Sequence, residues 1–108
     1  MFQSKINQTF KQRVIEITKN IPSSQVATYA QVALLAGSPK ASRAVGMIMS
    51  KNDSPKTMPC HRVVSSNGKL TGYAFGGIER KKEILKKEGV IFKSEETIDL
   101  KKSKWQPE

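Results

Sequence analysis

Residues 28–51, TYAQVALLAGSPKASRAVGMIMSK, contain the start and stop signals of two consecutive helices. Thr28 and Gln31 have the spacing of a capping box, which predicts that the first helix begins at Thr28. Gly37 is typical of a left-handed helix terminator, and Ser38-Pro39 is typical of an N-cap followed by the first helical residue. Two helices joined by so tight a turn form either a helix-turn-helix or an ordinary pair of antiparallel helices.

The second helix, predicted over about 39–51, combines an apolar stripe with a basic outer face. The residues expected to face the core are Val45, Ile48 and Met49. The outer face is expected to hold Lys40, Arg43 and Lys51 among the small residues Ala41, Ser42, Ala44 and Gly46. Small residues let a helix backbone approach another surface closely, and one long cation can project beyond them. This combination suits insertion into a nucleic-acid groove, and it also suits close packing between helices.

The segments on either side predict one further helix and a β-hairpin. Residues 4–19 place apolar side chains at helical spacing, and this helix is expected to end before Pro22 because the residue preceding a proline avoids the helical region. Residues 61–65 read as a short strand. The following Ser66-Asn67-Gly68-Lys69 is a strong signal for a hairpin turn, since Asn-Gly is the favoured type I′ pair.

The chain of 108 residues is expected to form a single domain, with its core over about 4–92 and a tail over 93–108. A last helix is predicted over about 78–88, and the polar residues 94–108 are expected to be loosely held around Trp105. These elements predict a mainly α fold with a small β-hairpin, a winged-helix-like DNA-binding domain containing a helix-turn-helix. The apolar runs are too short for a membrane span and the amino terminus lacks a secretory signal, so a monomeric cytoplasmic (nucleoid-associated) or nuclear protein is expected.

Positive charge is concentrated in the first 78 residues. The chain has 19 Lys and Arg against 9 Asp and Glu, a formal net charge of +10. Residues 1–78 hold ten of the bases and only two acids, whereas residues 79–108 hold nine bases and seven acids. A basic surface attracts the phosphate backbone because binding releases counterions. The charge therefore favours nucleic-acid binding, although many small basic proteins are merely soluble.

The only cysteine and the only histidine are adjacent, at Cys60 and His61, directly after Pro59. A single cysteine excludes an internal disulfide, and one neighbouring histidine argues against a zinc site. A cysteine becomes a nucleophile when a nearby cation, helix N-terminus or base favours its thiolate. In a strand the two side chains point to opposite faces, so His61 would need a bridging water, or a departure from strand geometry, to assist Cys60. Otherwise a lone cysteine is more often a small buried hydrophobe.

Three segments together resemble the O6-alkylguanine-DNA alkyltransferases, also called methylated-DNA–protein-cysteine methyltransferases. They are TYAQVALLAGSPKASRAVG (28–46), PCHRVVSSNGKLTGY (59–73) and GGIERKKEILKKEG (76–89), which occur in the family's order and spacing. The resemblance spans roughly residues 8–90. It implies that Cys60 takes the alkyl group from O6 of a damaged guanine in double-stranded DNA, in one irreversible turnover and without cofactor or metal.

The resemblance also implies how the thiol is activated. In the family the cysteine is activated through a water, the histidine and a buried glutamate, and these roles fall on Cys60, His61 and Glu88. Asn52 matches the asparagine that ties the recognition helix to the active-site loop. The neighbouring Asp53 departs from the family, which usually has proline there, so this loop is expected to be less rigid.

DNA recognition is implied in the same way. The target atom lies inside a duplex, so the base must be swung out, and the family's helix-turn-helix does this from the minor groove. Arg43 matches the arginine finger that fills the gap, and Tyr29 matches the tyrosine that crowds the 3′ phosphate. Tyr73 and the backbone near Ala74 line the lesion pocket, with Val63 offering a carbonyl to the exocyclic amine. Phosphate contacts carry no base specificity, and the candidates for them are Lys40, Lys51 and Lys56.

Two other functions compete with repair. The ending TIDLKKSKW (97–105) looks like the tail of alkyltransferase-like proteins, which bind damaged guanine and hand it to excision-repair proteins. Those proteins generally have tryptophan where this chain has Cys60, which favours the transferase. A helix-turn-helix regulator would read the major groove, and this helix offers few base-reading side chains besides Arg43.

Overall fold

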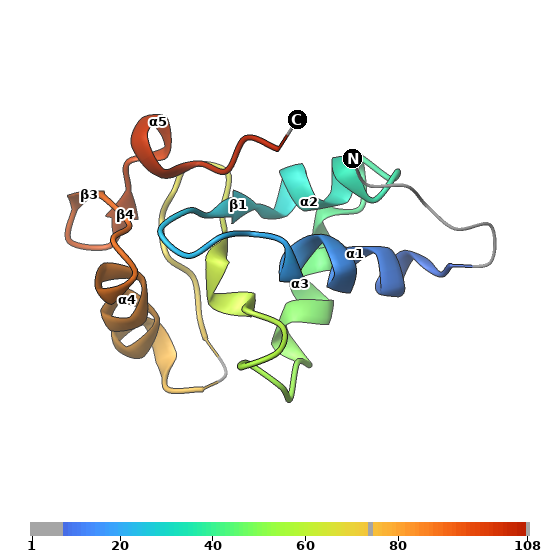
Figure 1. Ribbon diagram of the computed structural model, residues 1–108, viewed down its shortest axis with the longest axis horizontal. Coiled ribbons are helices and arrows are strands. Elements are labelled where there is room, and N and C mark those ends of the chain that lie inside the picture. Colours follow the sequence, from blue (N-terminus) through green and yellow to red (C-terminus); the bar gives the residue numbers. More distant parts are fainter. Residues whose placement is uncertain (1–7, 74, 108) are drawn as a thin grey trace.

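Three helices from the first half of the chain pack together at one end of the molecule (Figure 1). They are α1 (Phe10–Lys19), α2 (Tyr29–Leu35) and α3 (Ser42–Ser50). The structure, a computed structural model, describes residues 8–73 and 75–107 and measures 41 × 28 × 22 Å along its principal axes. The helix predicted from residue 4 begins at Phe10 because the Thr9 side chain caps it, and residues 4–7 lie outside the described residues.

The sequence signals predicted both ends of α2 correctly but not the start of α3. Thr28 and Gln31 form the predicted capping box, and Gly37 has the expected positive φ of 89°. The prediction that Ser38-Pro39 starts the next helix is wrong. Residues 38–41 form a turn instead, in which the Ala41 amide donates to the Ser38 carbonyl at 2.9 Å, and α3 begins at Ser42.

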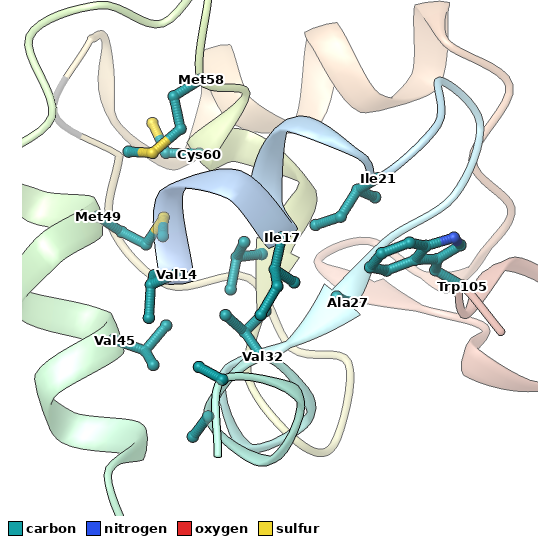
Figure 2. Close-up of a cluster of buried hydrophobic side chains, with 13 residues drawn as sticks. Val14, Ile17, Ile21, Ala27, Val32, Val45, Met49, Met58, Cys60 and Trp105 are labelled. Carbon is teal, nitrogen blue, oxygen red and sulfur yellow. The ribbon is translucent and has the colours of Figure 1, made fainter. Parts of the chain in front are cut away.

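The main core lies between these three helices. Val14 and Ile17 on α1, Val32 on α2, and Val45 and Met49 on α3 are all buried. Figure 2 shows Val14 pointing toward Val45 and Met49, with Cys60 and Met58 at one edge of the cluster. The apolar periodicity of the sequence therefore predicted the inward face of α3, where Val45 and Met49 are buried.

The segment after α3 departs from the predicted strand and hairpin. Cys60–Arg62 form a 3-10 helix, η1, and only Val63–Val64 are extended, as β2. β2 pairs in parallel with β1 (Ala27–Thr28), so the strand predicted over 61–65 is wrong in length and in partner. The contacts of this segment explain the difference, because His61 and Arg62 bind Glu88, the residue that follows α4 (Gly77–Lys87), instead of pairing in a strand.

The hairpin of the fold lies later in the chain than predicted. Asn67-Gly68 does form a tight turn, with Gly68 at φ 83° and its amide donating to Ser65. The chain after this turn does not return along β2, however, because Leu70 donates to Glu96 at 2.8 Å. The antiparallel pair is β3 (Phe92–Ser94) with β4 (Thr97–Ile98).

The last two helices lie on either side of the β3–β4 pair, and the tail returns to pack beside β1 (Figure 1). α4 (Gly77–Lys87) and α5 (Leu100–Ser103) flank β3 and β4. The prediction that residues 94–108 are loosely held is wrong for the described part. Trp105 is 8% exposed, and its carbonyl accepts a hydrogen bond from Gln31 Nε2 at 2.7 Å. Lys104 and Val26 form an isolated parallel β-bridge. The tail completes the core beside β1, as Figure 2 shows for Trp105.

The predicted fold class is confirmed, because the described residues are mainly helical and form two small two-stranded sheets. A second, smaller cluster of buried side chains holds α4 against β2 and β4; its members are Val26, Val64, Leu70, Leu85, Val90 and Ile98. Within the described residues, no helix is long and apolar enough to cross a membrane.

Candidate active site and the helix beside it

The Cys60 thiol lines a cavity next to α3. The side chain is only 5% exposed, but it borders a hollow of about 420 Å³. α3 contributes one wall through Gly46, Met49 and Ser50, and α4 contributes Lys81. A buried nucleophile with a cavity of this size beside it is reachable by a small group that enters the hollow and is shielded from bulk water.

Asn52 links the end of α3 to this thiol. Its amide nitrogen Nδ2 lies 3.2 Å from Cys60 Sγ and donates to the Met58 carbonyl at 3.0 Å. Its Oδ1 accepts from the Ser54 amide at 3.1 Å. The side chain therefore orients the loop from 52 to 60 and presents an N–H to the sulfur. These hydrogen bonds join the residue that follows α3 to the loop that carries Cys60.

His61 and Glu88 form a hydrogen-bonded pair across η1 and the end of α4. Nε2 of His61 lies 3.1 Å from each carboxylate oxygen of Glu88. Arg62 donates to the same carboxylate from Nε at 3.0 Å and from Nη2 at 2.6 Å, and its Nη1 donates to the Ile21 carbonyl at 2.9 Å. Such a bidentate, charge-assisted contact orients the carboxylate firmly.

This pairing determines which nitrogen of His61 is available. A carboxylate only accepts hydrogen bonds, so Nε2 carries the proton and Nδ1 holds the free lone pair of the neutral ring. Nδ1 is buried and forms no hydrogen bond with any residue that the structure describes. The ring therefore presents a proton acceptor on the side away from Glu88.

The protonation states agree with that arrangement. Burial lowers the pKa of His61 below 6.5, although the hydrogen bond to Glu88 opposes this effect, so the ring is neutral at pH 7. Burial would raise the pKa of Glu88, but the hydrogen bonds from Arg62 and His61 outweigh it and the pKa is lowered. Glu88 is consequently ionised at neutral pH.

Two tyrosines from distant parts of the chain border the same cavity. Tyr29 begins α2, and its hydroxyl shares a 3.1 Å hydrogen bond with Thr71 Oγ1. The Tyr73 ring lies edge-on to His61, with centroids 6.4 Å apart, and edge-on to Phe75 at 5.5 Å. Burial raises the pKa of Tyr73, and the nearby Cys60 adds to this effect. Two half-buried phenol rings thus form part of the cavity wall.

The remaining predicted pocket residues are placed differently. The Val63 side chain is fully buried, and its carbonyl accepts from Lys81 Nζ at 3.1 Å. Ala74 lies outside the described residues. The structure therefore brings together Cys60, Tyr29 and Tyr73 around one cavity but leaves the backbone near Ala74 undescribed.

The predicted DNA-contacting residues lie on the outer side of α3 and just before it. Lys40 and Arg43 are exposed, and Ala41 and Ser42 are half-buried. None of these four lines the Cys60 cavity. Lys51 and Lys56 are also exposed, on the loop that follows α3. These exposed cations therefore lie outside the Cys60 cavity, on α3 and in the segments before and after it.

A second hollow, of about 530 Å³, lies between α1, α3 and the loop at 51–58. It is the larger of the two, but it contains neither Cys60 nor either tyrosine. We assign the reaction to the smaller cavity, because it contains the nucleophile Cys60 and the larger one does not. Within the described residues, no group of His, Cys, Asp or Glu is arranged to hold a metal ion.

Sequence reasoning assigned no role to Arg62 and Lys81. Arg62 was quoted as part of a motif, but its partner Glu88 lies 26 residues away. Lys81 falls between Ile78 and Leu85 at helical spacing, on the inward stripe of α4, and is only 2% exposed. A lysine at an inward helical position is the signal that would have identified it.

Known proteins resemble this chain over most of its length. A family model described as "6-O-methylguanine DNA methyltransferase, DNA binding domain" matches residues 9–90. The methylated-DNA–protein-cysteine methyltransferase of Kluyveromyces lactis is 44% identical over 82 residues, which are 76% of this chain and 43% of that protein. The chain therefore spans less than half the length of this relative.

Two further proteins match more evenly in length. The DNA base-flipping protein of Escherichia coli is 40% identical over 99 residues, 90% of this chain and 74% of that protein. The crystal structure of S. pombe Atl1 in complex with damaged DNA containing O6-carboxymethylguanine superposes with a TM-score of 0.81 at 28% identity, covering 91% of this chain and 95% of that one. On the match to residues 9–90, the chain belongs to the 6-O-methylguanine DNA methyltransferase family, within its DNA-binding domain.

Proposed function

We propose that this protein repairs O6-alkylguanine in double-stranded DNA by transferring the alkyl group to Cys60. The observation that carries the proposal is the position of the Cys60 thiol, which borders a 420 Å³ cavity immediately beside α3. The Asn52 amide and the His61–Glu88 pair flank the same residue. Membership of the family and the methyltransferase from K. lactis support the same reaction.

Proton removal from Cys60 falls to His61. Its Nδ1 is the free acceptor of a neutral ring whose other nitrogen is hydrogen-bonded to Glu88. A water between Sγ and Nδ1 would pass the thiol proton to the ring, and Glu88 would stabilise the resulting imidazolium. Arg62 keeps the carboxylate oriented for this task. The donor Nδ2 of Asn52, 3.2 Å from Sγ, stabilises the thiolate that forms.

The transfer step is a displacement at carbon. The thiolate attacks the alkyl carbon, an S–C bond forms, and the C–O6 bond breaks with its electron pair leaving on O6. The guanine recovers its carbonyl and takes up a proton at N1, so the proton lost from the thiol is balanced overall. The thioether that remains on Cys60 is stable, and each molecule therefore reacts once.

Base extrusion is assigned to α2 and α3. The exposed Arg43 lies on α3 and the exposed Lys40 lies in the turn before it, while Gly46 and Ser50 of α3 border the cavity. A helix in the minor groove would therefore place the phosphate-contacting cations and the cavity mouth next to one another. Tyr29, at the start of α2, lines the cavity and would meet the backbone of the extruded nucleotide.

The test is the intact mass of the protein after reaction with a duplex containing O6-methylguanine. We expect a gain of one methylene unit that maps to Cys60. The variant Cys60→Ala is expected to show no gain, and a duplex with unmodified guanine supplies the matched control for the DNA. A wild-type protein that binds the lesion without changing mass would refute transfer.

A second function is favoured by the even match in length with Atl1 and the DNA base-flipping protein. On this alternative the chain binds the extruded lesion, leaves it unrepaired and signals to other proteins. Both functions need the same cavity and the same helix, and they differ only in whether Cys60 becomes alkylated. The mass measurement therefore separates the two.

A further inference from the structure

Lys81 is a buried cation that the transfer mechanism does not use. It lies on the inward face of α4, it is 2% exposed, and it lines the same cavity as Cys60. Tyr29 and Tyr73 form other parts of that cavity wall. A lysine is rarely buried to this degree, because removing an ammonium group from water is costly unless a partner compensates.

The protein compensates this charge only in part. Lys81 Nζ donates to the Val63 carbonyl at 3.1 Å, the one hydrogen bond of this ammonium to the described residues. An ammonium group has three donors. None of the described residues that line the cavity is acidic; the set is Tyr29, Gly46, Met49, Ser50, Cys60, Gly72, Tyr73 and Lys81 itself. The cavity wall therefore offers unused positive hydrogen-bond donors.

The ammonium remains charged under ordinary conditions. Burial lowers the pKa of Lys81 to about 8, while the neighbouring Cys60 acts in the opposite direction. At pH 7 the charged form still dominates. The cavity consequently presents a cation, rather than a neutral amine, to whatever enters it.

The geometry of displacement determines which part of a lesion meets this cation. The sulfur must approach the alkyl carbon from the side opposite O6, so that carbon lies between Cys60 and the guanine. Any further substituent on the carbon projects sideways, toward the cavity walls beside the cysteine. Lys81 belongs to those walls.

We propose that Lys81 makes the pocket selective for O6-alkylguanines whose alkyl group carries an anion, such as a carboxymethyl group. The inference rests on the proposed function, since it assumes that an extruded alkylguanine occupies the cavity. A carboxylate on the adduct would accept the unused donors of Lys81 and neutralise its charge. A neutral group of the same shape would leave the ammonium unpaired and gain nothing from it.

Two other roles for Lys81 make different predictions. Holding the Val63 carbonyl in place, or stabilising the negative charge on the sulfur, would help every lesion equally. Selectivity for an anionic adduct alters only the ratio between lesions. The decisive quantity is therefore a ratio between two adducts that differ in charge and not in shape.

The experiment compares duplexes containing O6-carboxymethylguanine and O6-carbamoylmethylguanine. The second replaces the carboxylate by a neutral amide of nearly the same size. Affinities are measured with Cys60→Ser protein, so that neither adduct reacts and the result does not depend on transfer. We expect the carboxymethyl duplex to bind about tenfold more tightly, a ratio typical of one close charge pair.

Lys81→Met, in the same Cys60→Ser background, is expected to reduce this ratio to about one or below, since an apolar pocket disfavours a carboxylate. Lys87→Met removes the same charge from an exposed position on α4 and should leave the ratio unchanged. A ratio near one in the protein that retains Lys81 overturns the inference even if Lys81→Met does not fold. Equal weakening of both lesions by Lys81→Met also overturns it.

The failure of the proposed function would look different. O6-methylguanine duplex and unmodified duplex are included in the same titrations. If the protein does not prefer the methylated duplex, no alkylguanine occupies the cavity and both proposals fall. If it prefers methylguanine over guanine but does not distinguish the charged from the neutral adduct, only the role of Lys81 is wrong.

Discussion

α3 and α4 both border the Cys60 cavity, yet different kinds of contact hold the two helices in place. α3 packs on α1 and α2 through apolar side chains, with Val45 fully buried and Met49 nearly so. α4 also buries Leu85, but it is tied to the active-site turn by polar groups. Glu88 binds His61 and Arg62, and Lys81 binds the Val63 carbonyl.

The difference has consequences for both stability and chemistry. Apolar packing is tolerant of the exact partner and depends mainly on buried area. The polar contacts of α4 are directional, and those of Glu88 also set the orientation and protonation state of His61 beside the thiol. Changes in the buried apolar core between α1, α2 and α3 should therefore alter stability alone, whereas changes in the polar contacts of Glu88 should alter stability and reaction rate together.

The largest expected effect on stability comes from the bundle. Ile17→Ala removes a side chain that is 2% exposed in the main core, and we expect a loss of about 3 kcal/mol in the free energy of unfolding. Urea denaturation measures this. Leu34→Ala on α2 deletes a similar group that is 61% exposed and should cost less than about 0.5 kcal/mol.

Ile17→Ala also tests whether the apolar bundle influences the reaction rate, as the polar contacts of α4 are expected to do. Folded Ile17→Ala should transfer methyl groups at close to the wild-type rate, measured at a temperature where it remains native. A tenfold slower transfer in fully folded protein would mean that the bundle also tunes the thiol, and the contrast between α3 and α4 would be lost.

The α4 network supplies the second prediction. Glu88→Gln keeps the shape of the side chain but removes the charge that Arg62 and His61 share. We expect transfer to slow at least about tenfold, because the imidazolium loses its stabilising partner. We also expect the free energy of unfolding to fall by about 2 kcal/mol, because hydrogen bonds to a charged group are weakened. Single-turnover mass spectrometry and urea denaturation give the two values.

Glu83→Gln is the matched control for that change. Glu83 lies on the same helix and pairs with Arg80, but the pair is exposed. We expect it to leave both stability and rate nearly unchanged, since exposed ion pairs contribute little. Equal effects of the two substitutions would show that only net charge matters and not the network around His61.

The contrast also explains which parts of the molecule could be predicted from the sequence. The capping box at Thr28, the terminator at Gly37 and the inward residues Val45 and Met49 depend on neighbours within a few positions, and all were predicted correctly. Such signals arise from backbone hydrogen bonds and side-chain periodicity inside one element. The helical bundle was therefore accessible to local reasoning.

The turn at Cys60 was not accessible in this way. Residues 61–65 have the composition of a strand, but the contacts of Arg62 with Glu88 and Ile21 span 26 and 41 residues and favour a 3-10 turn. The packed tail at Trp105 depends likewise on Gln31, 74 residues earlier. Local propensity does not contain these partners. Glu88 was anticipated only through the resemblance, and Lys81 was not anticipated at all.

The third prediction concerns the outer face of α3. Arg43 is exposed and lies outside the cavity, so Arg43→Ala should leave stability within about 0.5 kcal/mol of the wild type. We expect transfer from duplex DNA to slow about tenfold, equivalent to about 1.4 kcal/mol, because the flipped base loses the side chain that fills its place. Transfer from free O6-benzylguanine, which needs no flipping, should be unchanged.

The two substrates act as each other's control in this experiment. Equal losses on duplex and free base would indicate a general effect on the active site.

The smallest expected effect is the response of stability to mild acid. The folded-state pKa of His61 is lowered, mainly by burial, so the unfolded chain binds the proton more readily. The stabilisation is complete above about pH 6.5 and is lost as the pH falls through the lowered pKa. The pKa of Glu88 is lowered as well, but its contribution is lost only below about pH 4.5, so Glu88 does not respond between about pH 7 and that value.

Urea unfolding at about pH 7 and about pH 5.5 therefore isolates the histidine. We expect the wild-type free energy of unfolding to fall over this interval, and the fall to be smaller in His61→Gln, which cannot take up a proton. Subtracting the variant removes the background from the net charge of +10, which both proteins share at pH 7. An identical acid response in both would mean that His61 is not kept neutral by its surroundings, and the α4 network would then lack the proton acceptor on which transfer depends.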